Sequence, residues 1–259
     1  YFMEGRERGK MKTVLRCLRA DFLKIKNTAL FAAHLAIPFV MAGAFLLYYK
    51  ISPWDSFGKV QAFFQVMGMG YPFLIGVFCA IIAEQELAAG RYQSMLAVTH
   101  RGTVFFSKLL LLVLSGGFSV ILTSVLFGSG YYYWMEERVV AYSFYWIAAG
   151  IMLGGNLLLY ILHLFLAMRF NKGVTIGLGI AESLLSAVLM TGLGDGVWIY
   201  VPAVWANRMA GYVMFAYSTV TGPAVDSCRA VALCSIVTLI SLLAFMIWAK
   251  GWDGVCGEE

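Results

Sequence analysis

Long apolar segments alternate with short polar segments along the 259 residues of the chain. A helix needs about 20 mostly apolar residues to cross the hydrocarbon core of a membrane. The apolar residues here are continuous and do not alternate with polar ones as in barrel strands. The sequence therefore predicts an all-α integral membrane protein with six transmembrane helices. We expect these helices at about 28–48, 61–83, 105–127, 142–168, 173–193 and 230–249.

An amphipathic helix is predicted at residues 11–26, ahead of the first span. Its apolar residues recur at helical spacing: Met11, Val14, Leu15, Leu18, Phe22 and Ile25. Most of its basic residues lie off this stripe, as in helices that lie in the membrane interface. A basic anchor and an elbow helix that leads into a transport bundle both fit this pattern. Met11 is the better candidate for the native first residue, and residues 1–10 and 251–259 are treated as tails.

The polar segment between the second and third spans is the most informative part of the chain. We expect one short helix over 84–98, with Glu84 and Glu86 at its N-terminus, where negative charge complements the helix dipole. Gly90 would permit a bend, and Leu87, Tyr92, Met95 and Leu96 would form a contact patch. An ordinary loop is the alternative, but the length and the amphipathic order favour a helix that docks in the groove of a partner.

The segment 194–229 is too apolar for a free loop and too interrupted for a straight span, with breaks at Pro202, Gly211 and Pro223. A re-entrant or interfacial hairpin on the outer face fits best. The segment is rich in aromatic residues: Trp198, Tyr200, Trp205, Tyr212, Phe215 and Tyr217. They could form an outer gate or an aromatic belt at the membrane surface.

Composition supports the membrane assignment. The chain is 61% hydrophobic and 13% charged, whereas a soluble domain carries about 25% charged residues. The net charge of +5 does not indicate nucleic-acid binding, because the basic residues cluster beside the spans. Of the 19 Lys and Arg residues, six spans would place 14 on the side of both termini and 5 on the other side. The positive-inside rule makes the first side cytoplasmic.

Glu182 lies inside the fifth predicted span, where a charged side chain costs at least about 2.5–3.5 kcal/mol on insertion scales. We therefore expect it to face the interior of the bundle, with His34, Asn156 or His163 as possible companions. One interpretation is a structural hydrogen-bond network, which we favour. The other is part of a substrate path or a proton relay.

Enzyme chemistry is not expected from this sequence. It contains no GxxxxGK[ST] loop to bind ATP phosphates and neither an HExxH nor a GxSxG motif. Leu114-Ser115-Gly116-Gly117 imitates part of a nucleotide-binding signature but sits inside a span, which predicts a packing patch of small residues. The five cysteines form no CxxC pair, so we predict neither a disulfide framework nor a metal site.

Three segments, taken in order and spacing, carry a resemblance to a known family. They are MKTVLRCLRADFLKIKNT, then SPWDS after the first span, and EQELAAGRYQSMLAV leading into SKLLLL. With them the chain resembles the permeases of lantibiotic-immunity ABC transporters, in the ABC-2 superfamily, from Met11 to about Lys250. It is more similar to the MutG type than to the MutE/EpiE type. The family pattern has Asn-Phe-Gln after the glycine, whereas this chain has Arg91-Tyr92-Gln93.

The resemblance implies a single permease domain over 11–250 with an ABC-2 export fold and a cytoplasmic coupling helix at 84–98. It also implies a bacterial cytoplasmic membrane location, a second homologous permease and two copies of an ABC ATPase. ATP and Mg²⁺ would bind to that ATPase, so no cofactor is expected in this chain. The substrate would be a lantibiotic peptide expelled from the membrane lipid.

Two sets of site residues follow from this interpretation. The expected coupling residues are Glu84, Glu86, Gly90, Tyr92, Gln93 and Met95. The expected substrate path comprises Glu182, Trp198, Trp205, Tyr212 and Phe215, because aromatic side chains bury ring area against an amphipathic peptide. The alternatives are an ABC-2 exporter of another lipophilic or drug substrate and a peptide-sensing membrane subunit without transport.

Overall fold

The computed structural model describes residues 2–26, 28–98, 100–221 and 227–254, with only the backbone described for 2–11 and 227. Within these residues, six helical segments are long and apolar enough to cross a membrane, which confirms the predicted all-α membrane fold. They are α2 (Ala29–Ile51), α3 (Ser56–Ala88), α5 (Arg101–Ser129) with the π-helical η1 (Gly130–Trp134), α6 (Ser143–Gly155) with α7 (Leu157–Arg169), α8 (Lys172–Leu189) and α10 (Ser227–Gly251). The observed spans overlap all six predicted ranges.

Local sequence explains where several of these helices begin and break. Asp55 caps α3 by accepting a hydrogen bond from the Gly58 backbone N–H at 2.8 Å, and Asn171 caps α8 in the same way at Val174. The fourth span breaks at Asn156, whose side chain donates to the Met152 carbonyl at 2.8 Å. A glycine pair precedes this break, and glycine pairs and inserted side chains are common causes of helix kinks.

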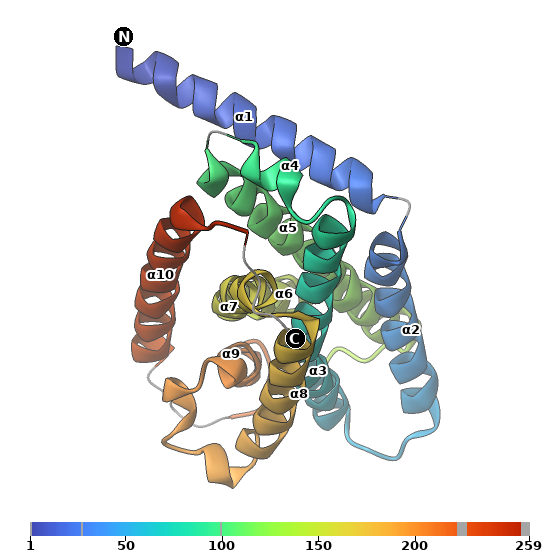
Figure 1. The fold of residues 1–259 in the computed structure, drawn as a ribbon. Coiled ribbons are helices and arrows are strands. Elements are labelled where there is room, and N and C mark those ends of the chain that lie inside the picture. The colour runs from blue at the N-terminus through green and yellow to red at the C-terminus, as the bar shows by residue number, and fades with distance from the viewer. Residues whose placement is uncertain (1, 27, 99, 222–226, 255–259) are drawn as a thin grey trace.

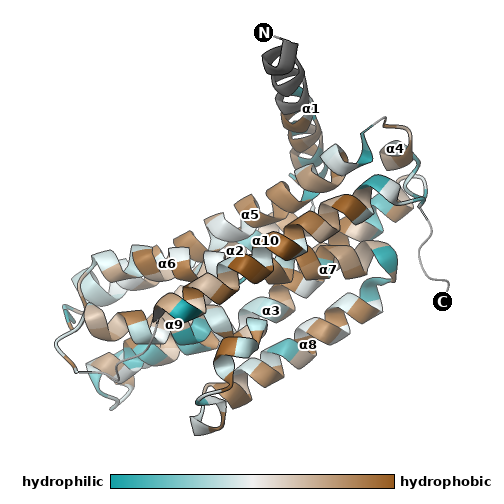
Figure 2. Cartoon of the chain, turned by 90° about the vertical axis from the view of Figure 1, so that its left-hand side faces the viewer, coloured by the Kyte–Doolittle hydropathy of each residue, from teal (hydrophilic) through white to brown (hydrophobic). Residues whose placement is uncertain are grey.

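The bundle is arranged around α3 and α7 (Figure 1). Helix α3 packs against α8, α7 and α9 (Pro202–Ala216), while α5 packs against α1 (Phe2–Ile25), α2 and α6. Helix α10 lies on the outside against α7 and α5, and the colours of Figure 2 show that most of its residues are hydrophobic. The large apolar residues exposed on α10 are Val231, Ile236, Leu239, Ile240, Leu243 and Ile247. This face is the one expected to contact lipid.

Helix α1 lies across the end of the bundle that also holds α4 (Gln93–Leu96), at a steep angle to the spans (Figures 1 and 2). The helix begins at Phe2, earlier than the predicted start at residue 11. Of its apolar stripe, Ile25 is buried and Leu18 packs against the core, whereas Leu15 and Phe22 stay exposed. The side chain of Met11 lies outside the described residues. The stripe is thus turned partly toward the spans.

The segment predicted as a hairpin forms η2 (Gly192–Gly194), η3 (Trp198–Tyr200) and α9, and its residues 222–226 lie outside the described part. Helix α9 packs between α3, α6 and α8, and residues 203–210 are all buried. This placement fits a re-entrant segment and not an interfacial one. Arg208 fixes its position by donating to the carbonyls of Leu189 and Thr191 at 2.6–3.0 Å. A cation is favourable there because α8 ends at Leu189.

Candidate functional site

The polar segment after α3 contains a turn and is not the single helix predicted for 84–98. Helix α3 continues to Ala88, and α4 begins only at Gln93. The residues between them include Gly90 at φ 124°, Arg91 at φ 47° and Tyr92 at φ 64°. The prediction was wrong because α3 continues into the polar segment as far as Ala88 and ends just before Gly90, where glycine permits a positive φ.

Glu84 and Glu86 therefore lie in the last turns of α3, not at a helix N-terminus. Negative charge is unfavourable at a helix C-terminus, and lysines compensate both carboxylates. Lys172 Nζ lies 2.6 Å from Glu84 Oε1, with both side chains about half exposed. Glu86 is buried, and its Oε1 lies 2.7 Å from Lys108 Nζ and 2.6 Å from Lys24 Nζ.

Glu86 belongs to a mostly buried group of charged and hydroxyl side chains from four helices, which we name the junction network. Lys108 Nζ also contacts Asp21 Oδ1 at 3.0 Å, and Ser107 Oγ donates to Asp21 Oδ2 at 2.9 Å. Ser94 of α4 donates to Glu86 at 3.2 Å. The members of the network are Asp21, Lys24, Glu86, Ser94, Ser107 and Lys108. Two carboxylates and two ammonium groups balance, which is the condition for keeping charges in a buried site.

Aromatic packing holds the same segment from the other side. Tyr92 is 4% exposed, and its ring lies edge-on to Trp252, with the centroids 5.2 Å apart. The Trp252 ring in turn contacts Phe105 of α5, and Arg101 donates to the Trp252 carbonyl. Met95 is also buried. The turn and α4 are therefore fixed to both α5 and the end of α10.

The six expected coupling residues separate into two groups. Glu86, Tyr92 and Met95 are buried, so they cannot touch a partner and can only position the segment. Glu84, Gly90 and Gln93 are exposed. The exposed surface, which we name the coupling face, comprises Leu87, Ala88, Ala89, Gly90, Arg91, Gln93 and Ser94.

Sequence reasoning missed Asp21, Ser107 and Lys108. Two signals were present. Asp21 is the one acidic residue of the stretch 11–26, and Lys108 is a lone lysine within the apolar run FFSKLLLL. An isolated charge in an apolar run needs a partner of opposite sign, because an unpaired charge is costly there. The two helices that supply the pair are far apart in the sequence, so only the fold identifies the pairing.

Of the companions expected for Glu182, the structure supplies His163. His163 Nε2 lies 2.8 Å from Glu182 Oε2, and His163 Nδ1 lies 2.8 Å from Thr175 Oγ1. His34 instead contacts the Leu30 carbonyl and stacks on Phe78, and Asn156 donates within its own helix. The expectation that His34 or Asn156 joins Glu182 was wrong.

The aromatic residues of the expected substrate path are mostly packing residues. Trp205 is 1% exposed, and its Nε1–H donates to the Ile199 carbonyl at 2.7 Å. Trp198 is buried against Tyr212, and Phe215 packs on Phe57. Substrate contact by Trp198 and Trp205 does not fit this placement, because α9 enters the bundle and carries Trp205 into a core with Trp198.

Within the segment 114–117, the two glycines pack between helices as predicted, whereas Leu114 is exposed. A Cβ at Gly116 would lie 1.7 Å from Tyr160 Oη, so α5 can approach α7 only with glycine there. Ser115 donates to the Leu111 carbonyl of its own helix.

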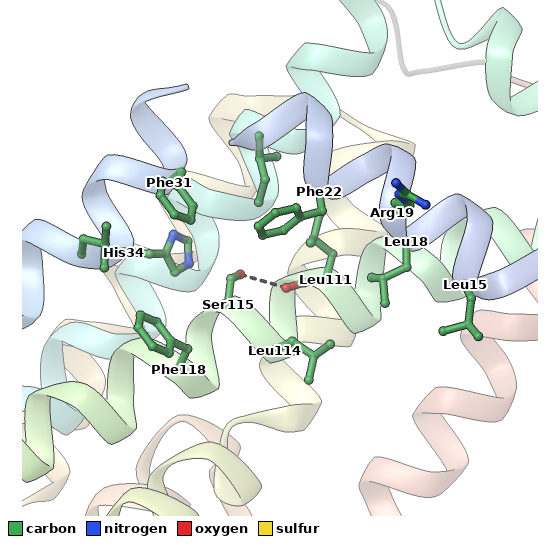
Figure 3. Close-up of a pocket in the computed structure, with 12 residues that line it drawn as sticks. Leu15, Leu18, Arg19, Phe22, Phe31, His34, Leu111, Leu114, Ser115 and Phe118 are labelled. Carbon is green, nitrogen blue, oxygen red and sulfur yellow. Dashed lines mark hydrogen bonds between the residues drawn. The ribbon is translucent and has the colours of Figure 1, made fainter. Parts of the chain in front are cut away.

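Leu114 and Ser115 also line an apolar groove of about 580 Å³ between α1, α2 and α5 (Figure 3). Figure 3 shows that the stripe of α1 forms one wall of this groove.

The helices and the polar end of the bundle define a polytopic membrane protein with an exposed tip between two spans. The sequence model of the family described as ABC-2 family transporter protein matches residues 17–188. The chain belongs to this family and is a membrane subunit of an ABC-2 transporter. Membership implies an ABC ATPase as its partner. No curated protein and no solved structure matches the chain.

Proposed function

We propose that the chain is the permease subunit of an ATP-driven exporter that expels lantibiotic peptides from the bacterial cytoplasmic membrane and so gives resistance. Two copies of a partner ATPase bind ATP and Mg²⁺, and a second, homologous permease completes the complex. Family membership supports the transport role. The resemblance of three sequence segments to lantibiotic-immunity permeases supports the substrate class. The distribution of Lys and Arg supports cytoplasmic termini and a cytoplasmic coupling face.

The junction network is the observation that carries this proposal. A partner that pushes on the coupling face moves α4, which contacts the network through the hydrogen bond from Ser94 to Glu86. Ion pairs then join Glu86 of α3 to α1 and α5. Buried charges that separate lose their compensation, so such pairs resist separation. A push on the tip is therefore passed to the helices as a unit and is not absorbed by a soft loop.

The packing of α3 gives this motion a route into the membrane. Helix α3 is continuous from the outer end of the bundle to the turn before α4, and it packs against α7, α8 and α9. Closure of the ATPase dimer on ATP binding would displace α3 together with α5. The outer segment around α9 would then shift relative to the second permease, which opens a path for the peptide.

A charge reversal on the coupling face tests the proposal. Arg91 is exposed, so Arg91→Glu combined with Gln93→Ala should leave the protein in the membrane at normal amounts. We expect co-purification of the ATPase and lantibiotic resistance to fall by about tenfold or more, as when a central interface contact is lost. Arg138→Glu is the matched control, because Arg138 is exposed in the loop before α6 at the other end of the bundle.

Each outcome separates the alternatives. Unchanged resistance in the Arg91→Glu, Gln93→Ala variant at normal expression would contradict the assignment of the coupling face. Co-purification of an ATPase whose activity responds to other lipophilic compounds but not to lantibiotics would favour a different export substrate. Peptide binding without any ATPase in the complex would favour a sensing subunit.

A further inference from the structure

A second apolar cavity lies between α7, α8, α9 and α10 and has a volume of about 620 Å³. This volume falls in the range of about 300–1,000 Å³ that is typical of sites for small ligands. Its walls include Ile161, Phe165, Leu185, Phe245 and Trp248. Helices α8 and α10 belong to the outside of the bundle, so the cavity is in reach of molecules dissolved in the lipid.

Glu182 is the one ionisable residue that lines this cavity. Its side chain is 12% exposed, and His163 lies behind it with no exposed surface. Within the described residues, His163 is the one hydrogen-bond partner of Glu182, and it contacts one of the two carboxylate oxygens. Aliphatic and aromatic side chains make up nearly all the remaining wall, with Ser241 as the polar exception. The cavity therefore presents a single acidic group at an apolar surface.

The hydrogen bonds around His163 and Glu182 determine how many protons this pair of side chains holds. Thr175 Oγ1 lies 3.2 Å from the His163 carbonyl, to which it can only donate. It must then accept from Nδ1–H of His163 at 2.8 Å. One further proton lies between His163 Nε2 and Glu182. The pair is thus electrically neutral, either as imidazole with carboxylic acid or as imidazolium with carboxylate, which lowers its cost inside a membrane.

A cation that enters the cavity can replace that proton without changing the net charge. The proton is released to the water at the membrane surface, so one positive charge enters the site as one leaves it. His163 stays neutral, and Glu182 as a carboxylate accepts hydrogen bonds from the incoming cation. The other elements facing the pair offer no competing charge: Gly76 of α3 lies against His163, and α9 and α10 contribute uncharged lining residues. Trp248 and two phenylalanines add aromatic faces that favour a cation.

We infer that this cavity binds a primary ammonium group carried on an apolar chain, such as a lysine side chain of an amphipathic peptide or the headgroup of an alkylamine. The apolar chain fills the space along α7 and α10, and the ammonium group binds Glu182. The inference adds to the proposed function the part of the substrate that this site binds. It rests on the proposed function only for the identity of the natural ligand.

Binding of dodecylammonium to the purified full-length chain in nanodiscs of neutral lipid tests the inference. Empty nanodiscs give the background, and dodecanol is the uncharged probe. We expect the wild-type chain to bind the amine about tenfold more tightly than the alcohol, because a hydrogen bond to a charged group is stronger than a neutral one. Glu182→Gln should remove this preference, whereas Glu84→Gln, at an exposed carboxylate, should keep it.

A second variant keeps the test decisive if Glu182→Gln does not fold. Ala244 lines the cavity and is exposed, so Ala244→Trp fills the space without touching the ion pair. It should lose binding of both probes. An unchanged amine preference in Glu182→Gln, or unchanged binding in Ala244→Trp, would overturn the inference. The assay involves neither the ATPase nor resistance, so failure of the proposed export function would leave its result unaffected.

Discussion

Two buried charge sites in this protein use the same chemistry in different ways. The junction network combines four charged residues from three long helices, and each carboxylate has a lysine and a hydroxyl as partners. The Glu182 site has one carboxylate and one imidazole, and it lies at the wall of a cavity. A site whose carboxylates are all paired with side chains of other helices holds the helices together. A site with an acidic group at an apolar cavity can still accept a ligand.

The choice of cation explains the difference. Lys108 is 2% exposed and lies between the carboxylates of Asp21 and Glu86, so the network needs all its members. Histidine can be neutral, so the His163–Glu182 pair can hold one proton and carry no charge. Such a pair is tolerated between spans and can exchange its proton for a cation.

Removal of Lys108 should have the largest effect. Lys108→Met leaves Asp21 and Glu86 without their shared cation, and breaking a buried pair in this way costs about 3–5 kcal/mol. Thermal unfolding in detergent should show a large loss of stability or a failure to fold. Lys172→Met is the matched control, because the exposed pair with Glu84 contributes about 0–1 kcal/mol. If the two variants were equally stable, Lys108 would not be needed to hold the junction network together.

The same substitution at both sites sharpens the comparison. Glu86→Gln leaves two ammonium groups with one carboxylate, and we expect a loss of about 3 kcal/mol. Glu182→Gln keeps an amide next to His163, and we expect a loss of about 1 kcal/mol, the size of one hydrogen bond. Equilibrium unfolding in mixed detergent micelles measures both changes. A larger loss at Glu182 than at Glu86 would reverse the roles that we assign to the two sites.

A smaller effect is expected at the backbone contact behind the Glu182 pair. A Cβ at Gly76 would lie 2.8 Å from the Thr175 carbonyl oxygen and 3.3 Å from the His163 ring. Gly76→Ala should therefore force α3 away from α8 and cost about 1–3 kcal/mol. Gly70→Ala on the same helix has open space and should be neutral or stabilise by up to about 1 kcal/mol. Matching unfolding curves for the two variants would show that the close approach of α3 to α8 at Gly76 does not contribute to stability.

The sequence predicted the parts of this molecule that depend on local pattern. Six spans, the amphipathic character of α1 and the packing role of Gly116 follow from hydrophobic length, spacing and residue size. The pairing of Asp21 with Lys108 could not be predicted, since it depends on where α1 crosses the bundle. Trp205 was expected to meet a substrate because an aromatic residue in an apolar outer segment looks the same in sequence whether the segment lies on the membrane or enters the bundle.

Substitutions in the turn before α4 show how far the position of the coupling face depends on the backbone of this turn and how far on the junction network. Arg91 has φ 47°, a conformation that costs a residue other than glycine about 1–2 kcal/mol. Arg91→Gly removes this strain and adds about 0.5–1 kcal/mol of unfolded-state entropy, so we expect a net stabilisation of about 0.5–1 kcal/mol in the same unfolding assay. Gly90→Ala, at φ 124°, should instead destabilise. If neither variant changes the unfolding curve, the turn contributes little, and the buried charges of the junction network with the contact between Tyr92 and Trp252 hold the tip by themselves.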